Sequence, residues 1–272
     1  MPKYTEKDTE KYYDSEDSIY QSFWDKEGSC HWGLFKNKEN NYLKASEYLT
    51  DLMIEKSGIN SRSKVLDLGC GNGEVTIQVA KKTGSYIFGV DLSGVRIKNA
   101  EDKLKQNALA FVSFKKASAT NLPFKDGEFT HVWSQATIYH VHDKDKALSE
   151  VYRVLKKDGI FIFDDLTKPK KIISKESRKY VYDRLLFDTP FSFKTYQEAL
   201  KNKGFKIIEA KEISEHLKTS YQKLIDILEN KVNNSEEAKL IEKYKKLILA
   251  YGFTIKAVDK KELGWALFLC KK

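Results

Sequence analysis

Apolar residues along the chain follow two different periods. Ranges 45–57, 75–84, 94–107, 143–159 and 193–204 have apolar residues at helical spacing, and several of these ranges end at a glycine. Short apolar runs of strand length occur before, between and after them, at 65–68, 86–92, 110–117, 129–135, 159–166, 205–213 and 264–272. Strands that alternate with helices form parallel βαβ units, so the pattern predicts an α/β fold with a three-layer arrangement.

Two long stretches interrupt this alternation. Residues 168–202 and 217–261 lie between the last predicted strands, and we expect both to cap the carboxyl edge of the sheet, where ligands bind in open α/β folds. The Leu and Ile residues of the second stretch also fit plain core packing. The predicted core then comprises 45–167, 203–216 and 262–272, and its last two strands are expected to pair antiparallel at the sheet edge.

Composition limits the class of protein. The 272 residues suffice for one large domain, and 41% hydrophobic with 32% charged residues is the balance of a globular chain. No apolar run approaches the roughly 18 residues that a membrane span needs, and the N-terminus lacks the apolar region of a signal peptide. We therefore expect a cytoplasmic protein without membrane insertion, as a monomer or a homodimer.

The net charge and the cysteines do not indicate a nucleic-acid, disulfide or metal-binding function. The net charge is +9, but the lysines are interleaved with acidic residues as in EEAKLIEKYKK, which indicates a solvated surface and no nucleic-acid partner. Cys30, Cys70 and Cys270 are too few and too scattered for a disulfide framework or a zinc site. We interpret them as reduced thiols and expect no metal.

The most specific motif is VLDLGCGNGE, from Val65 to Glu74. Its glycines at 69, 71 and 73 permit a tight strand-to-helix turn, and backbone N–H groups there can approach a ligand at the positive end of the following helix. A dinucleotide fingerprint would need its third glycine at position 74, where Glu74 stands, so the motif disfavours a pyrophosphate ligand. Asp91 ends the next strand, where a carboxylate can accept both hydroxyls of a ribose.

A family resemblance begins at these residues. The motifs LDLGCGNG, GVDLS, SATNLPFKDGEFTHVWSQATIYHV and VLKKDGIFIF, in this order over residues 60–166, resemble the class I S-adenosylmethionine-dependent methyltransferases. The resemblance implies a Rossmann-like fold with a seven-stranded, mostly parallel sheet and helices on both faces. It also implies the cofactor S-adenosyl-L-methionine, which leaves as S-adenosyl-L-homocysteine. The implied cofactor-binding residues are Asp67, Gly69, Cys70, Gly71, Gly73, Asp91, Leu92, Ser118, Ala119, Thr120 and Gln135. Many relatives have an aspartate where Ser118 stands, and it accepts from the adenine amino group.

The sequence outside these motifs narrows the resemblance to one group of methyltransferases. The pattern YYDSEDSIYQSFW…HWGLF, the spacing from Trp133 to His140 and the segment GWALFLCKK are similar to glycine/sarcosine/dimethylglycine N-methyltransferases. This similarity implies N-methylation of a small-molecule amine. The segment WDKEGSCH departs from the usual pattern of that group. A C- or O-methyltransferase of a lipid, isoprenoid or other apolar natural product is the alternative, since the Leu- and Ile-rich cap segments would suit such a substrate.

Residues 1–44 are unusually rich in aromatic rings. Methyl transfer from a sulfonium needs alignment and exclusion of water, so we expect this segment to fold back as a lid. Aromatic faces attract a sulfonium or an ammonium by about 0.5–2 kcal/mol per ring. The predicted substrate-binding residues are Tyr12, Tyr20, Trp24, Trp32, His140, Lys168 and Trp265, with Tyr13 as a further candidate ring. His140, a possible proton acceptor, and Gln135 are the predicted catalytic residues.

Overall fold

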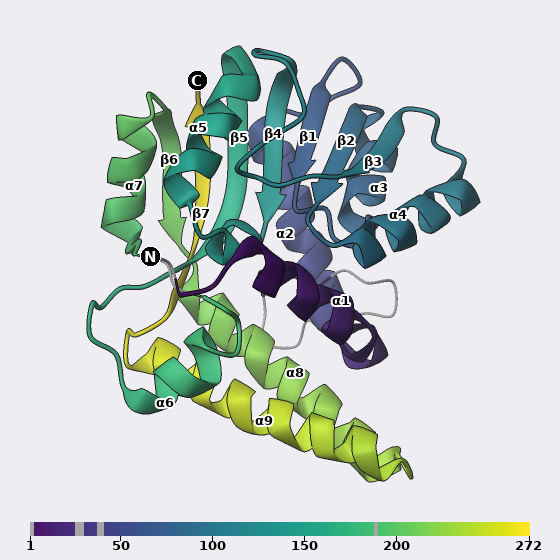
Figure 1. Ribbon diagram of the computed structural model, residues 1–272, viewed down its shortest axis with the longest axis vertical. Helices are drawn as coiled ribbons and strands as arrows, with labels where there is room; N and C mark the ends of the chain where they lie inside the picture. The colour runs from purple at the N-terminus through teal and green to yellow at the C-terminus, as the bar shows by residue number, and fades with distance from the viewer. Residues whose placement is uncertain (1–2, 25–29, 37–40, 188–189) are drawn as a thin grey trace.

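The central element is one sheet with the strand order β3-β2-β1-β4-β5-β7-β6 (Figure 1). The computed structural model describes residues 3–24, 30–36, 41–187 and 190–272, and within these ranges the sheet has seven strands. They are β1 (Lys64–Leu68), β2 (Tyr86–Asp91), β3 (Val112–Lys116), β4 (Phe129–Gln135), β5 (Leu155–Thr167), β6 (Lys206–Glu212) and β7 (Gly264–Lys271). Each strand lies in or overlaps an apolar run named above, so the predicted strands are confirmed.

Pairing in the sheet is parallel from β3 through β5 and antiparallel at β7. Strand β1 pairs with β2 on one side and β4 on the other, and β7 pairs antiparallel with both β5 and β6. The four parallel pairs put the carboxyl ends of β1 to β5 at one edge. The expected antiparallel closure and the mostly parallel α/β fold are both confirmed.

Helices cover both faces of the sheet because neighbouring strand residues point to opposite sides. Val65 joins a buried cluster with residues of α2 (Tyr42–Ser57) and α3 (Glu74–Thr83). The next residue, Leu66, joins a second cluster with residues of α5 (Lys144–Val154) and α7 (Phe193–Asn202). Both faces of the sheet are therefore buried under helices, as the continuous apolar strands require.

Helix α4 (Gly94–Asn107) covers the range that the apolar spacing predicts. The side chain of Ser93 accepts a hydrogen bond from the Arg96 N–H at 3.1 Å and caps the helix N-terminus. At the other end Ala108 takes a left-handed conformation, with φ of 51°. Capping at Ser93 also fixes Arg96 in the first turn of α4, close to the carboxyl end of β2.

Several helices gather at the carboxyl edge of the parallel strands. Figure 1 shows α1 (Glu6–Phe23) crossing below the strand ends, and α8 (Ser214–Asn234) and α9 (Ala238–Asp259) extending away as an antiparallel pair. The connection after β5 contains α6 (Lys175–Ser177) and a π-helical turn, η2 (Arg178–Tyr182), packed against α9. Among the helices of the described ranges, none is both long and apolar enough to cross a membrane.

Candidate active site

The loop from β1 to α3 forms the floor of a large pocket. Gly69, Gly71 and Gly73 all have positive φ angles, of 82°, 53° and 79°. A Cβ on Gly69 would lie 2.1 Å from the side chain of Thr137, and one on Gly73 would lie 2.7 Å from the ring of Phe114. Only glycine fits these two positions, and the loop therefore brings its backbone close to whatever the pocket holds.

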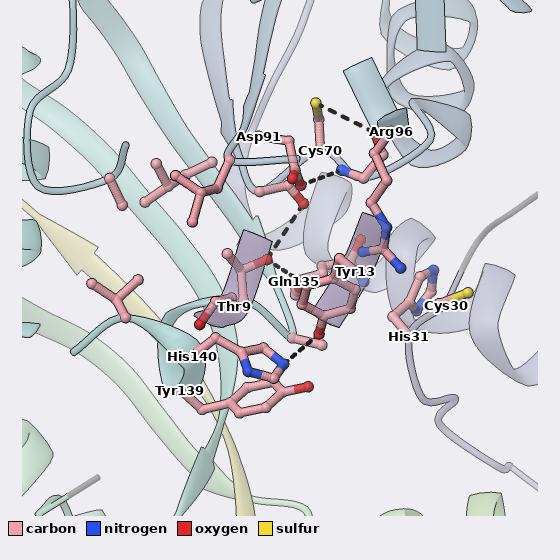
Figure 2. A pocket seen from close by; sticks show the side chains of 18 of the residues that line it. Thr9, Tyr13, Cys30, His31, Cys70, Asp91, Arg96, Gln135, Tyr139 and His140 are labelled. Carbon is pink, nitrogen blue, oxygen red and sulfur yellow. Dashed lines mark hydrogen bonds between the residues drawn. The ribbon is translucent and has the colours of Figure 1, made fainter. Parts of the chain in front are cut away.

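Asp91 lies at the end of β2 beside this loop. Its Oδ2 accepts from the Gly71 N–H at 3.0 Å and its Oδ1 accepts from the Ser93 N–H at 2.8 Å (Figure 2). Burial raises the pKa of the Asp91 carboxyl, while the Arg96 guanidinium lowers it. The two backbone donors fix the carboxylate, and each oxygen retains a lone pair for a ligand in the pocket.

Asp67 lies below the glycine loop. Its Oδ2 accepts from the Thr76 hydroxyl at 2.5 Å, and burial raises its pKa to about 7. This contact ties the end of β1 to the first turn of α3. Asp67 also lines the pocket, together with Cys70, whose thiol pKa burial raises well above its usual value.

Helix α1 is fastened over the pocket by a buried polar network. Asp17 is 3% exposed, and its carboxylate accepts from Arg96 Nε at 2.8 Å, Asn72 Nδ2 at 3.0 Å and Asn99 Nδ2 at 3.3 Å. The guanidinium of Arg96 also lies 3.9 Å from the ring centre of Tyr13. The network joins α1 to the glycine loop and to α4, so the helix has a defined position over this loop.

Tyr13 and His140 meet across the pocket. The Tyr13 hydroxyl is hydrogen-bonded to His140 Nε2, and the two side chains come from α1 and from the turn η1 (Ile138–His140) after β4 (Figure 2). Burial lowers the pKa of His140 well below 6.5, and the nearby charges of Lys144 and Arg96 act in the same direction. The imidazole is therefore neutral at neutral pH.

The wall beyond this pair consists of aromatic rings. Tyr20 is hydrogen-bonded to Tyr12 through their hydroxyls and packs on Trp24 with ring centres 5.8 Å apart. Trp32 lies against Tyr221 of α8 at 6.1 Å and Trp265 of β7 at 5.7 Å. Segments far apart in sequence thus make one aromatic wall.

A single guanidinium interrupts this wall. Arg184, just after η2, lines the pocket and lies 5.2 Å from the ring centre of Tyr251. Its Nε donates to the Tyr180 carbonyl at 3.1 Å, whereas its buried Nη2 has no hydrogen-bond partner among the described residues. Burial lowers the pKa of this basic group, whereas the surrounding tyrosines, Tyr20 and Tyr221 first, raise it.

Four other pocket groups share this lack of a partner. Within the described part of the chain, the buried Trp32 Nε1, Arg96 Nη2, Gln135 Nε2 and His140 Nδ1 have no hydrogen-bond partner. Gln135 ends β4, and its Oε1 accepts from Trp133 Nε1 at 3.2 Å. Buried polar groups are nearly always satisfied in proteins, so these atoms indicate where a polar ligand binds.

The structure brings most of the predicted site residues together. The pocket, of about 1350 Å³ with its mouth included, is lined by thirteen of them: Tyr20, Trp24, Trp32, Asp67, Gly69, Cys70, Gly71, Asp91, Leu92, Ser118, Ala119, Gln135 and His140. Five predicted residues are not part of its wall: Tyr12, Gly73, Thr120, Lys168 and Trp265. Tyr12 and Thr120 bind wall residues, Tyr20 and Ser118, and Trp265 lies behind Trp32. The predicted roles of all these residues remain predictions.

Sequence reasoning missed several wall residues. Tyr139, Tyr221 and Glu6 line the pocket and are not among the predicted site residues. Tyr139 lies within the motif that ends in ATIYHV, whereas no motif marks Tyr221 or Glu6. Arg184 is also missing from the predicted residues, because it lies in a segment with several other basic side chains. A usable signal lies next to it, because Val181 and Leu185 at helical spacing are both buried and place the arginine in an apolar turn.

Comparison with known proteins agrees with this geometry. Residues 66–163 match the methyltransferase domain family. The chain is 27% identical to the sarcosine/dimethylglycine N-methyltransferase of Halorhodospira halochloris, over 96% of this chain and 95% of that protein. It is 29% identical to the glycine/sarcosine/dimethylglycine N-methyltransferase of Actinopolyspora halophila, over 82% of this chain and 40% of that protein. The chain thus spans less than half of the second relative.

Other matches act at carbon, and the fold is shared widely. Sterol 24-C-methyltransferase of Eremothecium gossypii is 27% identical over 74% of this chain and 54% of that protein. A crystal structure from Galdieria sulphuraria, assigned to a sarcosine dimethylglycine methyltransferase, superposes with a TM-score of 0.85 at 25% identity, covering 94% of this chain and 98% of that one. The matching domain and the curated relatives agree on methyl transfer, and the relatives differ in the atom that they methylate.

Proposed function

We propose that this chain, whose residues 66–163 form an S-adenosylmethionine-dependent methyltransferase domain, methylates the nitrogen of a small amine that carries an acidic group, as in sarcosine or dimethylglycine. The observation behind this proposal is the Arg184 guanidinium in an aromatic pocket, with Nη2 unpartnered among the described residues. A buried cation is costly unless an anion accompanies it. A substrate carboxylate or phosphate would supply that anion.

The residues at the strand ends fit the cofactor S-adenosyl-L-methionine. The glycine loop leaves room for close backbone approach, since a Cβ at Gly69 would collide with Thr137. Asp91 would accept the ribose hydroxyls with its remaining lone pairs, and the unpartnered amide of Gln135 would donate to the methionine carboxylate. When bound, the cofactor supplies an electrophilic methyl group on a sulfonium.

The chain's own residues would align the amine for this transfer. Arg184 would hold the acidic group, while Tyr20 and Trp32 present rings to the nitrogen as it gains positive charge. Methyl transfer would form the nitrogen–carbon bond as the carbon–sulfur bond breaks, with S-adenosyl-L-homocysteine as the product. Helix α1, held by Asp17, would cover the reacting atoms and limit the access of water.

His140 would accept a hydrogen bond from the amine. Its Nε2 is bonded to the Tyr13 hydroxyl, whereas its Nδ1 is buried and has no partner in the described ranges. Because burial lowers the pKa of His140, the ring is neutral, and Nδ1 can accept a hydrogen bond from the amine when Nε2–H donates to the Tyr13 oxygen. Such a bond orients the nitrogen even where water finally takes the proton.

Methylation of carbon or oxygen in an apolar natural product is the alternative. Trp24 and Leu185 in the pocket wall are large and apolar, and they would contact a lipid or isoprenoid chain. A substrate of that kind without an acid would leave Arg184 Nη2 without a partner. The two proposals therefore differ in what they require of this arginine.

The first experiment is mass spectrometry of the protein with methyl-deuterated S-adenosylmethionine and a substrate panel. The panel contains glycine, sarcosine, dimethylglycine, phosphoethanolamine, ethanolamine and a detergent-dispersed lipid extract. Label on an acid-bearing amine, with little on ethanolamine, supports the proposal. Comparing the label on the carboxylate-bearing amines with the label on phosphoethanolamine shows which acidic group the site prefers. Label in the lipid extract alone would select the alternative.

The variant Arg184→Met tests directly whether the Arg184 guanidinium binds the acidic group of the substrate. Loss of a charge-assisted hydrogen bond costs about 1.5–3 kcal/mol, so kcat/KM for the acid-bearing amine should fall roughly 10- to 150-fold. Arg178→Met makes the same chemical change in the same segment, at a residue outside the pocket wall, and should have little effect. Equal effects of the two changes would contradict the role of Arg184.

A further inference from the structure

One end of the pocket contains a carboxylate that no cofactor motif supplies. The wall between the ends of β2 and β3 consists of Leu92, Ala117, Ser118 and Ala119, and Glu6 of α1 completes it. Glu6 Oε1 accepts from the Ser118 hydroxyl at 2.5 Å and from the Thr120 hydroxyl at 3.0 Å. Helix α1 thus contributes the acidic group at this end.

The hydrogen bonds of Ser118 determine which group can accept from a ligand here. The Ser118 hydroxyl donates to Glu6, and its oxygen already accepts from the Thr120 N–H at 3.0 Å. The hydroxyls of Ser118 and Thr120 also lie 2.8 Å apart. Ser118 is therefore largely committed, whereas Oε2 of Glu6 has no hydrogen-bond partner within the described residues. Glu6 offers the strongest acceptor at this end.

We propose that Glu6 accepts a hydrogen bond from the 6-amino group of the cofactor's adenine, so that α1 completes the adenine site. The neighbouring wall residues, Leu92 and Ala119, suit the faces of a flat base, and Asp91 at the adjoining strand end suits its ribose. An amino group is a donor, and a carboxylate is the acceptor that makes the stronger hydrogen bond. A hypoxanthine base presents a carbonyl oxygen instead, which the Glu6 carboxylate repels.

The position of Glu6 links adenine recognition to the docking of α1. Glu6 is the first residue of the helix, and the helix is held on the core through Asp14 to the Ser93 hydroxyl at 2.5 Å and through Asp17 to Arg96 at 2.8 Å. Only with α1 docked does the carboxylate reach the pocket. Cofactor binding and helix docking must then strengthen each other by the same factor.

Calorimetric binding to the full chain tests this without any methyl-accepting substrate. The inference rests on the methyltransferase cofactor but not on the amine substrate, so its failure leaves the proposed substrate class untouched. The probes are S-adenosylhomocysteine and its deaminated analogue S-inosylhomocysteine. A hydrogen bond to a charged group corresponds to about 10- to 150-fold in affinity, and partial exposure of Glu6 favours the lower end. The unchanged protein should prefer the adenosine compound by about 10-fold or more.

Variants separate base recognition from simple tethering. Glu6→Ala should remove most of the preference, and Glu6→Gln, whose amide can accept or donate, should bring the two affinities within a few-fold. Glu10→Ala, which breaks the ion pair of the same helix with Lys116, should keep the preference. Adding Ser118→Asp to Glu6→Ala should restore the preference for the adenosine compound, because the new carboxylate would lie on the core side of the same site. Retained preference in both Glu6 variants, or equal loss in Glu10→Ala, would overturn the proposal.

Discussion

Replacing Asp17 by alanine removes the acceptor on which the docking of α1 depends. The Asp17 and Arg96 side chains are 4% and 10% exposed, and Asn72 and Asn99 donate to the same carboxylate. Removing one partner of a buried ion pair costs about 3–5 kcal/mol, because the other charge stays buried. Arg96 keeps the charge of Asp91 nearby, so we expect the lower end, about 3 kcal/mol.

This free energy converts into a measurable fall in Tm. For 272 residues, an unfolding entropy of about 2.1 cal/mol/K per residue makes a loss of about 3 kcal/mol equal to roughly 5 °C. Scanning calorimetry and urea titration of the cofactor-free protein measure the loss. Amide hydrogen exchange in α1 separates undocking of the helix alone from global destabilisation.

Glu10→Ala is the matched control on the same helix. Its ion pair with Lys116 is exposed, with side chains 30% and 50% accessible, and such pairs contribute at most about 1 kcal/mol. If Asp17→Ala were no more harmful than Glu10→Ala in Tm, urea midpoint and α1 exchange, the reasoning from burial would be refuted.

Three further changes have defined outcomes. Asp91→Ala should weaken S-adenosylhomocysteine about 10- to 100-fold by losing charged hydrogen bonds to the ribose, and an unchanged calorimetric Kd would exclude the ribose role. Gly73→Ala should cost at least about 1–2 kcal/mol in urea titration, since its φ is 79° and Phe114 blocks the Cβ, whereas Gly252→Ala, with no atom within 4 Å, should be harmless. The pKa of His31 is lowered by burial to about 4, so the unfolded chain binds this proton first and the fold loses stability as pH falls from 6.5 toward 4. The destabilisation caused by His31→Leu should therefore be about 2 kcal/mol smaller at pH 5 than at pH 7.5, and a pH-independent difference would contradict the assignment.

The sheet and its glycine loop were predictable because local signals determine them. Strand β4, predicted from FTHVWSQ, occupies Phe129–Gln135, and α4 agrees with its predicted range because Ser93 caps it. The glycine loop needs positive φ angles whatever surrounds it. Features of this kind depend on a few consecutive residues, and the sequence displays them directly.

Helix α1 could not be predicted in the same way. Its segment stood out for aromatic rings, but one of its buried positions is Asp17, which binds Arg96 of a distant helix. Two of the five buried positions of α1 are polar, so its apolar stripe is interrupted and the helical periodicity is weak. Arg184 is a similar case, because the tyrosines near its guanidinium, Tyr20, Tyr221 and Tyr251, come from other parts of the chain.

The place of β7 in the sheet constrains the order in which the chain can assemble. Strand β6 touches the rest of the sheet only through β7, which is made later, after both α8 and α9. During synthesis on the ribosome, β1 to β5 can pair as they emerge, whereas β6 must wait without a partner until residues 264–271 appear and insert beside β5. Pairing over such a separation is slow, and the exposed edge of β5 is open to wrong partners meanwhile. Insertion of β7 beside β5 is thus the step that completes the sheet and covers this edge.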